Sequence, residues 1–432
     1  MNSNESAVSR SLPSDWLLLG MIVLIPFMTP PVLRPVIAAD LLFTVLAVTF
    51  AVEALLGLRR LRWLGEFGAL AAYACGLAPS LLASSDIDRS LFKYATEIYL
   101  ILLAGLTAIM VDSQLKLHRA LLAWLAATAL VCLVAAISLV AFVTGPSWIL
   151  DYTGNGFGSL PPGDYPRLAL TFWGANMACN YLNVSLGLAI VAHQLGVISR
   201  TPYSLLLAGI VLAALSTISA GLGGLALLAG VWIWIKNRRG RPAFAFATLT
   251  FGLAVAAFFI IALAVTPFAY SNAPTLVRLP GGVTLYAAGH ILTWSAALSQ
   301  FLEHPLIGIG IGIEPIRIAL SFPGERNVLT DAHNIFLSIG AQCGVVGLAG
   351  LAVLLWFVIR RTPWSAALRG EHLPLFVLGA TFLDVFVYQG LGGSFEDTRH
   401  VWALLGLFIA AARLDLSRAG ENNRRADAPS SG

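Results

Sequence analysis

The strongest constraint on this chain is a series of apolar runs, most of them long enough to cross a lipid bilayer as helices. Runs of this length and composition are typical of transmembrane helices. The sequence therefore predicts an all-α polytopic membrane protein with about 12 transmembrane helices. The runs cover residues 16–29, 36–57, 64–84, 91–111, 118–144, 168–195, 202–219, 221–235, 243–267, 333–359, 373–392 and 400–415.

The composition favours one membrane domain. Of the 432 residues, 58% are hydrophobic and 11% are charged, whereas about a quarter of the residues in a soluble domain are charged. We expect a transmembrane domain over residues 1–418 and a disordered cytoplasmic tail over residues 419–432. Residues 1–15 lack the features of a signal peptide, so the first apolar run is expected to be retained.

The basic residues predict an orientation in the membrane. If the N-terminus is cytoplasmic, 18 of the 26 Lys and Arg residues fall on the cytoplasmic side, and the opposite orientation would reverse this bias. The positive-inside rule therefore predicts that both termini are cytoplasmic. The basic residues form short clusters between apolar runs and no basic stripe interleaved with aromatic residues, so no nucleic-acid partner is expected.

Two segments on the outer side are too long for simple turns. Residues 145–167 are rich in Gly and Pro, and residues 268–332 form a large loop before the tenth predicted helix, with a helix-like piece at residues 285–303. Long loops often carry binding or catalytic residues. We therefore expect the chemistry on the extracytoplasmic side.

Arginines on this outer side are candidate anion ligands. Arg167 directly precedes an apolar run, and the large loop contains Arg278, Arg317 and Arg326. One interpretation is that each arginine lies at the interface or in water. The other is a shared anion site, because guanidinium binds phosphate oxygens with two parallel hydrogen bonds. A lipid diphosphate is the expected anion.

Polar residues inside apolar runs form a second group of candidates. Asn176, Asn180 and Asn183 have the spacing of one helical face, which indicates hydrogen bonds between helices or a polar path for a substrate. Asp384 is a functional candidate because a carboxylate within the membrane is costly.

Two charged groups near the outer boundary have structural interpretations. Arg89, Lys93 and Glu97 are four residues apart and are expected to form an ion-paired helix face. Residues 394–397 fit a helix-capping pattern.

His333 begins the tenth predicted helix. On its own it is interpreted as an interfacial side chain, although histidine can also accept a proton from a hydroxyl group near neutral pH. The surrounding pattern favours the second role: His333 and Asn334 are followed, after nine residues, by Gly344 and Gly347.

This pattern resembles the signature of the O-antigen ligase family, which includes ligases that join O-antigen to lipid A-core and related polysaccharide polymerases. Other similar pieces are Arg167 with Thr171-Phe172, Trp294 with His304-Pro305-Leu306, and residues 395–402. His290 stands where the family often has an arginine. Ser219-Ala220-Gly221 stands where it often has Ser-Arg-Gly.

The resemblance implies an inverting, metal-independent glycosyltransferase without a cofactor at the periplasmic face of the bacterial inner membrane. Its donor would be a glycan linked to undecaprenyl diphosphate, and its acceptor lipid A-core or another glycan. His333 would be the general base. Arg167, Arg278, His290 and Arg326 would bind the diphosphate, and Asn334 and Asp384 would support the site.

Two alternatives remain at this stage. A polymerase of the same family would transfer the growing chain to another lipid-linked repeat. A transporter or flippase of lipid-linked glycans could also have twelve spans with both ends inside, although the sequence contains no convincing inverted repeat.

Overall fold

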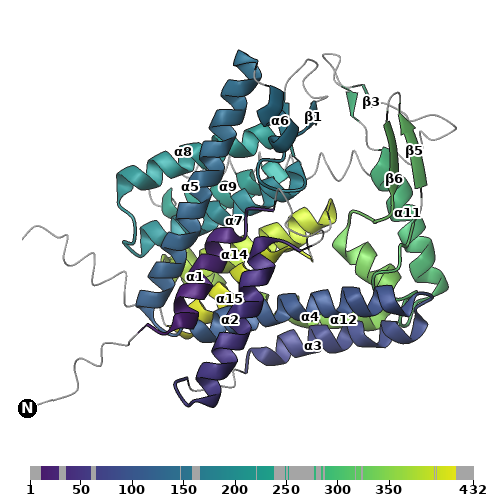
Figure 1. Cartoon of the computed structure of the whole chain (residues 1–432), viewed down its shortest axis with the longest axis horizontal. Helices are drawn as coiled ribbons and strands as arrows, with labels where there is room; N and C mark the ends of the chain where they lie inside the picture. The colour runs from purple at the N-terminus through teal and green to yellow at the C-terminus, as the bar shows by residue number, and fades with distance from the viewer. Residues whose placement is uncertain are drawn as a thin grey trace, which may run out of the picture.

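The computed structural model describes residues 11–28, 36–59, 65–145, 147–157, 166–219, 221–237, 249, 252, 277–278, 284–285, 288–316, 318–322, 325–393, 395 and 397–414. Eleven of the twelve predicted helices are present there (Figure 1). They are α1 (Pro13–Leu24), α2 (Ala38–Leu55), α3 (Phe67–Leu77) with η1 (Ala78–Ala83), α4 (Ile87–Met110), α5 (Gln114–Thr144), α7 (Ala175–Gln194), α8 (Arg200–Thr217), α9 (Gly221–Asn237), α12 (Ile335–Arg361), α14 (Leu373–Leu383) with η3 (Asp384–Tyr388) and η4 (Gln389–Leu391), and α15 (Arg399–Arg413). The run predicted at residues 243–267 lies outside the described residues, except for residues 249 and 252.

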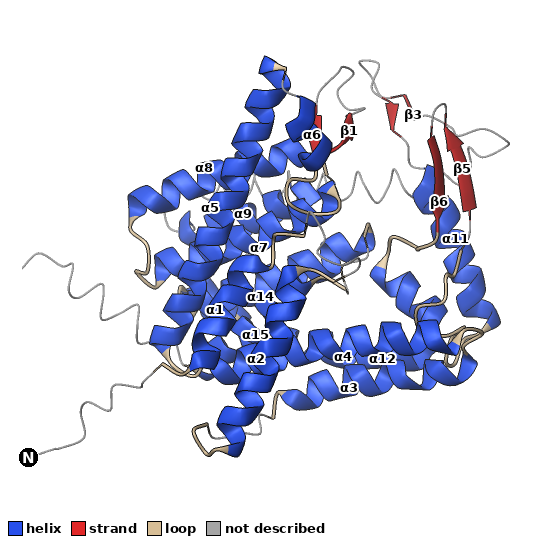
Figure 2. Cartoon of the chain, in the orientation of Figure 1, coloured by secondary structure: helices blue, strands red, loops and turns tan. Residues whose placement is uncertain are grey.

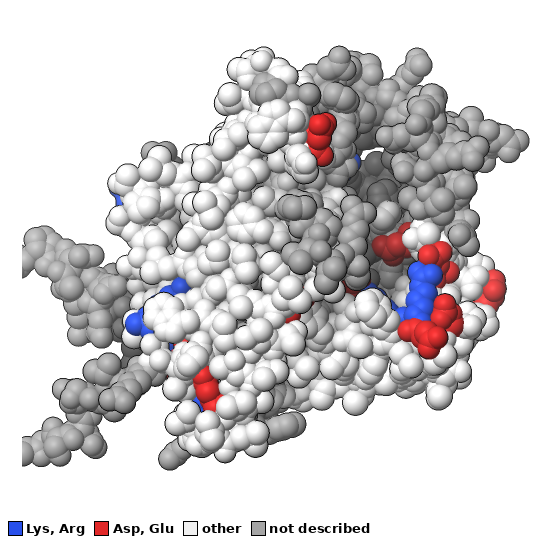
Figure 3. All heavy atoms as spheres, in the orientation of Figure 1, with Lys and Arg blue, Asp and Glu red and all other residues white. Residues whose placement is uncertain are grey.

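The described helices make this a multi-pass membrane protein. Seven helical segments are long and apolar enough to cross a membrane, and three shorter apolar helices accompany them. Figure 3 shows a surface that is largely free of charge over the helices, with the charged side chains in a few separate groups, the largest of them at the right. Such a surface suits contact with lipid, because hydrocarbon cannot solvate charge.

The two long segments between the predicted spans contain short helices and also short strands, and the strands were not part of the all-α prediction. A short helix, α6 (Ser147–Thr153), follows α5, and the amphipathic piece of the large loop is the helix α11 (Ala288–Glu303). Three antiparallel hairpins connect β1 (Gly154–Phe157) with β2 (Pro166–Leu168), β3 (Val277–Arg278) with β4 (Thr284–Leu285), and β5 (Ile318–Phe322) with β6 (Glu325–Leu329). Figure 2 shows these strands near the upper right of the molecule.

Helix α7 lies at the centre of the bundle and is almost entirely buried. It packs against α5, α8, α9 and α14. Small residues permit this close packing: a Cβ atom added at Gly187 would overlap the side chain of Thr381 on α14. Burial on all sides explains why its polar residues must find partners within the protein.

Helix α12 is kinked at Gly344, whose φ of 63° lies in the left-handed region. The kink frees backbone groups that the segment Pro305–Gly310 then satisfies. Val345 N and Val346 N donate to the carbonyls of Pro305 and Leu306 at 2.8 and 3.2 Å. On the other side of the kink, Ile309 N and Gly310 N donate to the carbonyls of Ala341 and Gln342, both at 3.0 Å. A Cβ atom at position 344 would overlap the Leu306 carbonyl, so the approach requires glycine.

Charged residues join several helix ends near the C-terminal end of α4. Arg59 binds Asp15 at 2.5 Å and Glu53 at 2.7 Å, and Lys116 binds Asp15 at 3.3 Å. Arg413 Nη1 donates to the Ala108 carbonyl at 2.8 Å. The start of α1 and the end of α15 therefore lie at the same end of the bundle.

Candidate active site

His333 occupies the short connection between β6 and α12. Its backbone is left-handed, with a φ of 49°, which is uncommon for a residue other than glycine. The backbone is held on both sides: Thr293 Oγ1 on α11 donates to the Ala332 carbonyl at 3.1 Å, and Asn334 caps α12. Unusual backbone held in place by its surroundings is frequent at functional sites.

Asn334 has a clear structural role beside the histidine. Its Oδ1 accepts hydrogen bonds from the backbone N–H groups of Phe336 at 3.0 Å and Leu337 at 3.2 Å. Its Nδ2 donates to the Leu391 carbonyl at 3.2 Å. Asn334 therefore fixes the start of α12 and joins it to η4.

Asp331 lies next to His333 and was not singled out from the sequence. Its Oδ2 is 3.5 Å from His333 Nδ1, and its Oδ1 accepts a hydrogen bond from Ser338 Oγ at 2.8 Å. The His333 side chain is 43% exposed, so solvent or a substrate can reach it. Spacing alone could have suggested this pair, because the two residues are separated by one alanine.

The Gly344 and Gly347 half of the signature contributes packing. Gly344 is the kink residue, and a Cβ atom at Gly347 would overlap the side chain of Cys343 one turn earlier. The His304-Pro305-Leu306 string and Gly308 lie against this kink. These separate pieces of the sequence pattern are thus parts of one contact.

Arg167 lies in β2, eight residues before α7 begins. Its Nη2 donates to Asn176 Oδ1 at 3.0 Å, and its Nε donates to the Thr217 carbonyl at 3.3 Å. Ser219 Oγ also donates to Asn176 Oδ1, at 2.9 Å. Burial lowers the pKa of Arg167, although arginine stays charged at any working pH. The guanidinium is therefore held by neutral groups, and its described contacts include no carboxylate.

The other two asparagines of α7 make hydrogen bonds between helices. Asn180 Nδ2 donates to the Val385 carbonyl at 2.9 Å and to Gln389 Oε1 at 3.1 Å, and Asn180 Oδ1 is 2.8 Å from His400 Nε2. Asn183 Nδ2 donates to the Gly221 carbonyl at 2.9 Å. The structural interpretation of this helix face is confirmed.

Asp384 belongs to the same buried polar group. Its Oδ2 accepts hydrogen bonds from Asn183 Nδ2 and Gln389 Nε2, both at 3.4 Å. Gly224 on α9 faces this carboxylate so closely that a Cβ atom there would overlap it. Asp384 is buried within the bundle, away from solvent.

A series of hydrogen bonds and helix turns connects the histidine region with Arg167. Asn334 binds Leu391, and two residues earlier in the same turn Gln389 binds Asn180. One helical turn before Asn180, Asn176 binds Arg167. Helix α7 and η4 thus connect the two regions of the predicted site.

The remaining predicted anion ligands are placed only by their backbone. Arg278 belongs to β3, His290 to the first turn of α11, and Arg326 to β6. Their side chains, and all of Arg317, lie outside the described part of the chain. Their proposed role in diphosphate binding stays a prediction.

The predicted ion-paired face is confirmed only in part. Lys93 binds Glu97 at 3.1 Å, but Arg89 pairs with Glu314 at 2.9 Å. Lys93 also binds Asp397. The capping interpretation of residues 394–397 is wrong for Asp397: α15 begins at Arg399, Thr398 occupies the N-cap, and Asp397 forms an ion pair instead.

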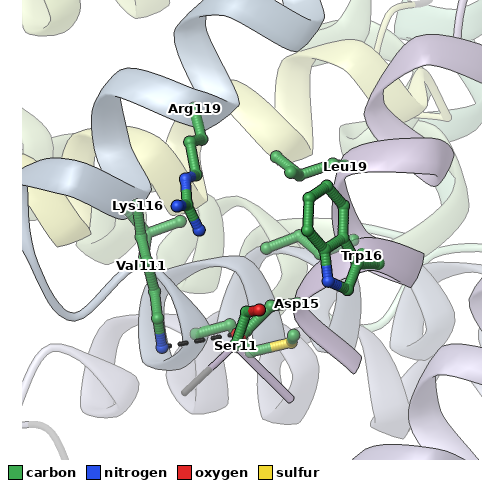
Figure 4. Close-up of a pocket in the computed structure, with 9 residues that line it drawn as sticks. Ser11, Asp15, Trp16, Leu19, Val111, Lys116 and Arg119 are labelled. Atoms are coloured by element: carbon green, nitrogen blue, oxygen red, sulfur yellow. Dashed lines mark ion pairs between the residues drawn. The ribbon is translucent and has the colours of Figure 1, made fainter. Parts of the chain in front are cut away.

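A pocket at the opposite end of α4 contains none of the predicted site residues. Figure 4 shows Trp16 on α1 and Lys116 and Arg119 on α5 around Asp15, which pairs with Lys116. This pocket is separate from the candidate site.

Among the residues that the structure describes, no group of three or more His, Cys, Asp or Glu side chains could hold a metal ion. Metal independence of the reaction remains a prediction.

The chain was compared with known protein families and with curated proteins. No curated protein matches the chain. A family model described as O-antigen ligase matches residues 202–352, a segment that contains His333, Asn334, Gly344 and Gly347. Over this segment the chain is similar to the O-antigen ligase family.

Proposed function

We propose that this protein is an O-antigen ligase: an inverting glycosyltransferase that moves a glycan from undecaprenyl diphosphate to lipid A-core at the periplasmic face of the bacterial inner membrane. The family match and the multi-pass fold support this proposal. The observation that carries it is the position of His333, a partly exposed histidine next to a carboxylate, on tightly held backbone at one end of the bundle.

In this reaction His333 acts as the general base. It takes the proton from the acceptor hydroxyl while that oxygen attacks the anomeric carbon of the donor sugar. The bond between the anomeric carbon and the diphosphate oxygen breaks on the opposite face, so the configuration inverts. Undecaprenyl diphosphate leaves with the electron pair of that bond.

Arg167 would stabilise the departing diphosphate together with Arg278, His290 and Arg326. Asn176 and the Thr217 carbonyl already orient the Arg167 guanidinium, and preorganised donors stabilise developing charge without further rearrangement. These arginines would supply the positive charge that a divalent metal supplies elsewhere, so the proposed reaction needs no metal.

Asn334 and Asp384 would support the site indirectly. Asn334 holds the start of α12, and Asp384 holds the polar group around α7. Neither needs to touch the substrate to affect the geometry between His333 and Arg167.

The proposal places both termini in the cytoplasm. It includes about twelve spans, one of which is the predicted run at residues 243–267. The shared location of the start of α1 and the end of α15 supports the placement of the termini on one side. In a cysteine-free background, cysteines at positions 155 and 327 should react with an impermeant thiol reagent from outside. A cysteine at position 239 should stay unlabelled in intact spheroplasts, and its labelling would reverse the orientation.

Deletion of the gene followed by gel analysis of surface glycans tests the function. Loss of capped lipopolysaccharide with accumulation of lipid-linked polymer is the expected result. Lipopolysaccharide that carries single repeats would instead identify a polymerase. A separate transport assay in vesicles tests the other alternative: movement of the lipid-linked donor across the membrane that depends on this protein would identify a transporter.

A further inference from the structure

We propose that Asp331 is a positioning residue for His333, and that Ser338 in turn holds Asp331. This proposal rests on the proposed function, because it assigns a partner to the proposed base. Three observations carry it: the placement of the two side chains, the hydrogen bond behind the carboxylate, and the fixed backbone between them.

The two side chains are arranged as a base and its orienting group. Asp331 Oδ2 is 3.5 Å from His333 Nδ1. This is at the long end for a hydrogen bond, as is frequent in a site without substrate, where catalytic contacts tighten on binding. A carboxylate at Nδ1 favours the tautomer with the proton on Nδ1, which leaves the lone pair on Nε2 to accept a proton from the acceptor hydroxyl.

The carboxylate is itself restrained. Ser338 Oγ, one turn into α12, donates to Asp331 Oδ1 at 2.8 Å and so leaves Oδ2 directed at the histidine. Asp397 lies close enough to repel the Asp331 carboxylate electrostatically, and the ion pair of Asp397 with Lys93 offsets that charge.

The backbone limits the movement of the pair. Asp331 and His333 flank Ala332, whose carbonyl is bound by Thr293 of α11, and Asn334 caps the helix that follows. The left-handed conformation of His333 fixes the direction in which its side chain leaves the backbone. A base held in this way loses little freedom when the acceptor binds.

Purified, reconstituted protein tests the proposal with lipid-linked donor and lipid A-core acceptor. Asp331→Asn should lower kcat by about 10- to 1,000-fold and leave KM for both substrates nearly unchanged, because the carboxylate acts through the histidine. Asp331→Glu should restore part of the loss, and Ser338→Ala should lower kcat by about three- to tenfold. Glu314→Gln is the matched control, because it removes a carboxylate that pairs with Arg89 and should keep wild-type activity.

A spectroscopic readout separates positioning from general support of the fold. In protein labelled with ¹⁵N-histidine, the His333 signals, identified by their loss in His333→Gly, should show the proton on Nδ1. In Asp331→Asn the population should shift towards the Nε2-protonated form. If Asp331→Asn does not fold, Ser338→Ala and Asp331→Glu provide the same kcat and tautomer measurements.

Wild-type kcat in Asp331→Asn, or an unchanged kcat with a raised acceptor KM, would overturn the positioning role while leaving the proposed function intact. Full activity of His333→Ala would instead refute the proposed function. The two failures are therefore distinguishable.

Discussion

Arg399 and Asp40 form a two-point ion pair across 359 residues of the chain. Arg399 Nε and Nη2 lie 2.5 and 2.7 Å from Asp40 Oδ1 and Oδ2, and Tyr99 Oη donates to Asp40 Oδ1 at 2.7 Å. Asp40 Oδ2 also accepts from the backbone N–H of Ile37 at 2.9 Å. One carboxylate thus joins the starts of α2 and α15 with the middle of α4.

The first prediction follows from this pair. Arg399→Ala leaves the mostly buried Asp40 carboxylate without its cation and should destabilise the protein by about 2–4 kcal/mol. Thermal unfolding in detergent should show a lower Tm. Arg369→Ala is the control, because its ion pair with Glu371 is exposed and should contribute at most about 0.5 kcal/mol. Equal Tm values for the two variants would contradict the prediction.

The second prediction concerns His333. His333→Ala and His333→Gly should both lower turnover by about two to four orders of magnitude, because each removes the proton-accepting nitrogen, while donor binding changes little. The glycine variant should be more stable than the alanine variant by about 1 kcal/mol, since glycine adopts the left-handed backbone without steric cost. Turnover and thermal unfolding measure the two effects. Added imidazole should restore some turnover to His333→Gly.

The third prediction concerns Arg167. Arg167→Ala should weaken donor binding by about 1.5–3 kcal/mol, the value of a hydrogen bond to a charged group. Arg167→Lys should recover only part of this, because an ammonium cannot reproduce the planar guanidinium contacts. Titration with a lipid-linked donor analogue measures the affinities. Unchanged affinity in Arg167→Ala would remove Arg167 from the diphosphate site.

The fourth prediction tests the kink of α12. Gly344→Ala introduces a Cβ atom that overlaps the Leu306 carbonyl on a left-handed backbone, and should cost several kcal/mol or prevent folding. Gly57→Ala is a matched control, because Gly57 is also left-handed but faces open space, so its cost should be about 1–2 kcal/mol. Expression level and Tm in detergent compare the variants. A smaller effect at position 344 than at position 57 would contradict the packing role.

The fifth prediction concerns metal ions. Because arginine side chains are proposed to carry the charge of the departing diphosphate, turnover should persist in EDTA. Loss of turnover that Mg²⁺ or Mn²⁺ restores would refute the metal-independent mechanism.

The helices could be predicted from the sequence because apolar runs of bilayer length have one stable backbone solution in lipid. Breaks within the helices and long-range partners of their side chains could not be predicted. The sequence does not show that Gly344 breaks α12, because the break depends on hydrogen bonds from Pro305–Gly310, some 35 residues earlier along the chain. In the same way, Asp397 fits a local capping pattern, but Lys93 is a long-range partner that no local pattern can reveal.

The candidate site shows the same limit. His333 could be singled out as a candidate because its motif is local, and the shared face of the α7 asparagines could be predicted from their spacing. Ser338 could not be linked to Asp331, since that contact requires the exact start of α12. Asp384 was singled out as costly in the membrane; Asn183 and Gln389 bind its Oδ2, whereas its buried Oδ1 has no hydrogen-bond partner among the described residues.

Two contacts fix the part of the large loop that follows α11. Pro305–Gly310 is bound to the kink, and Ala332 is bound by Thr293. The β5–β6 hairpin lies between these two attachments. Any force on the hairpin would therefore reach the bundle through these two attachments, and His333 directly follows the second of them.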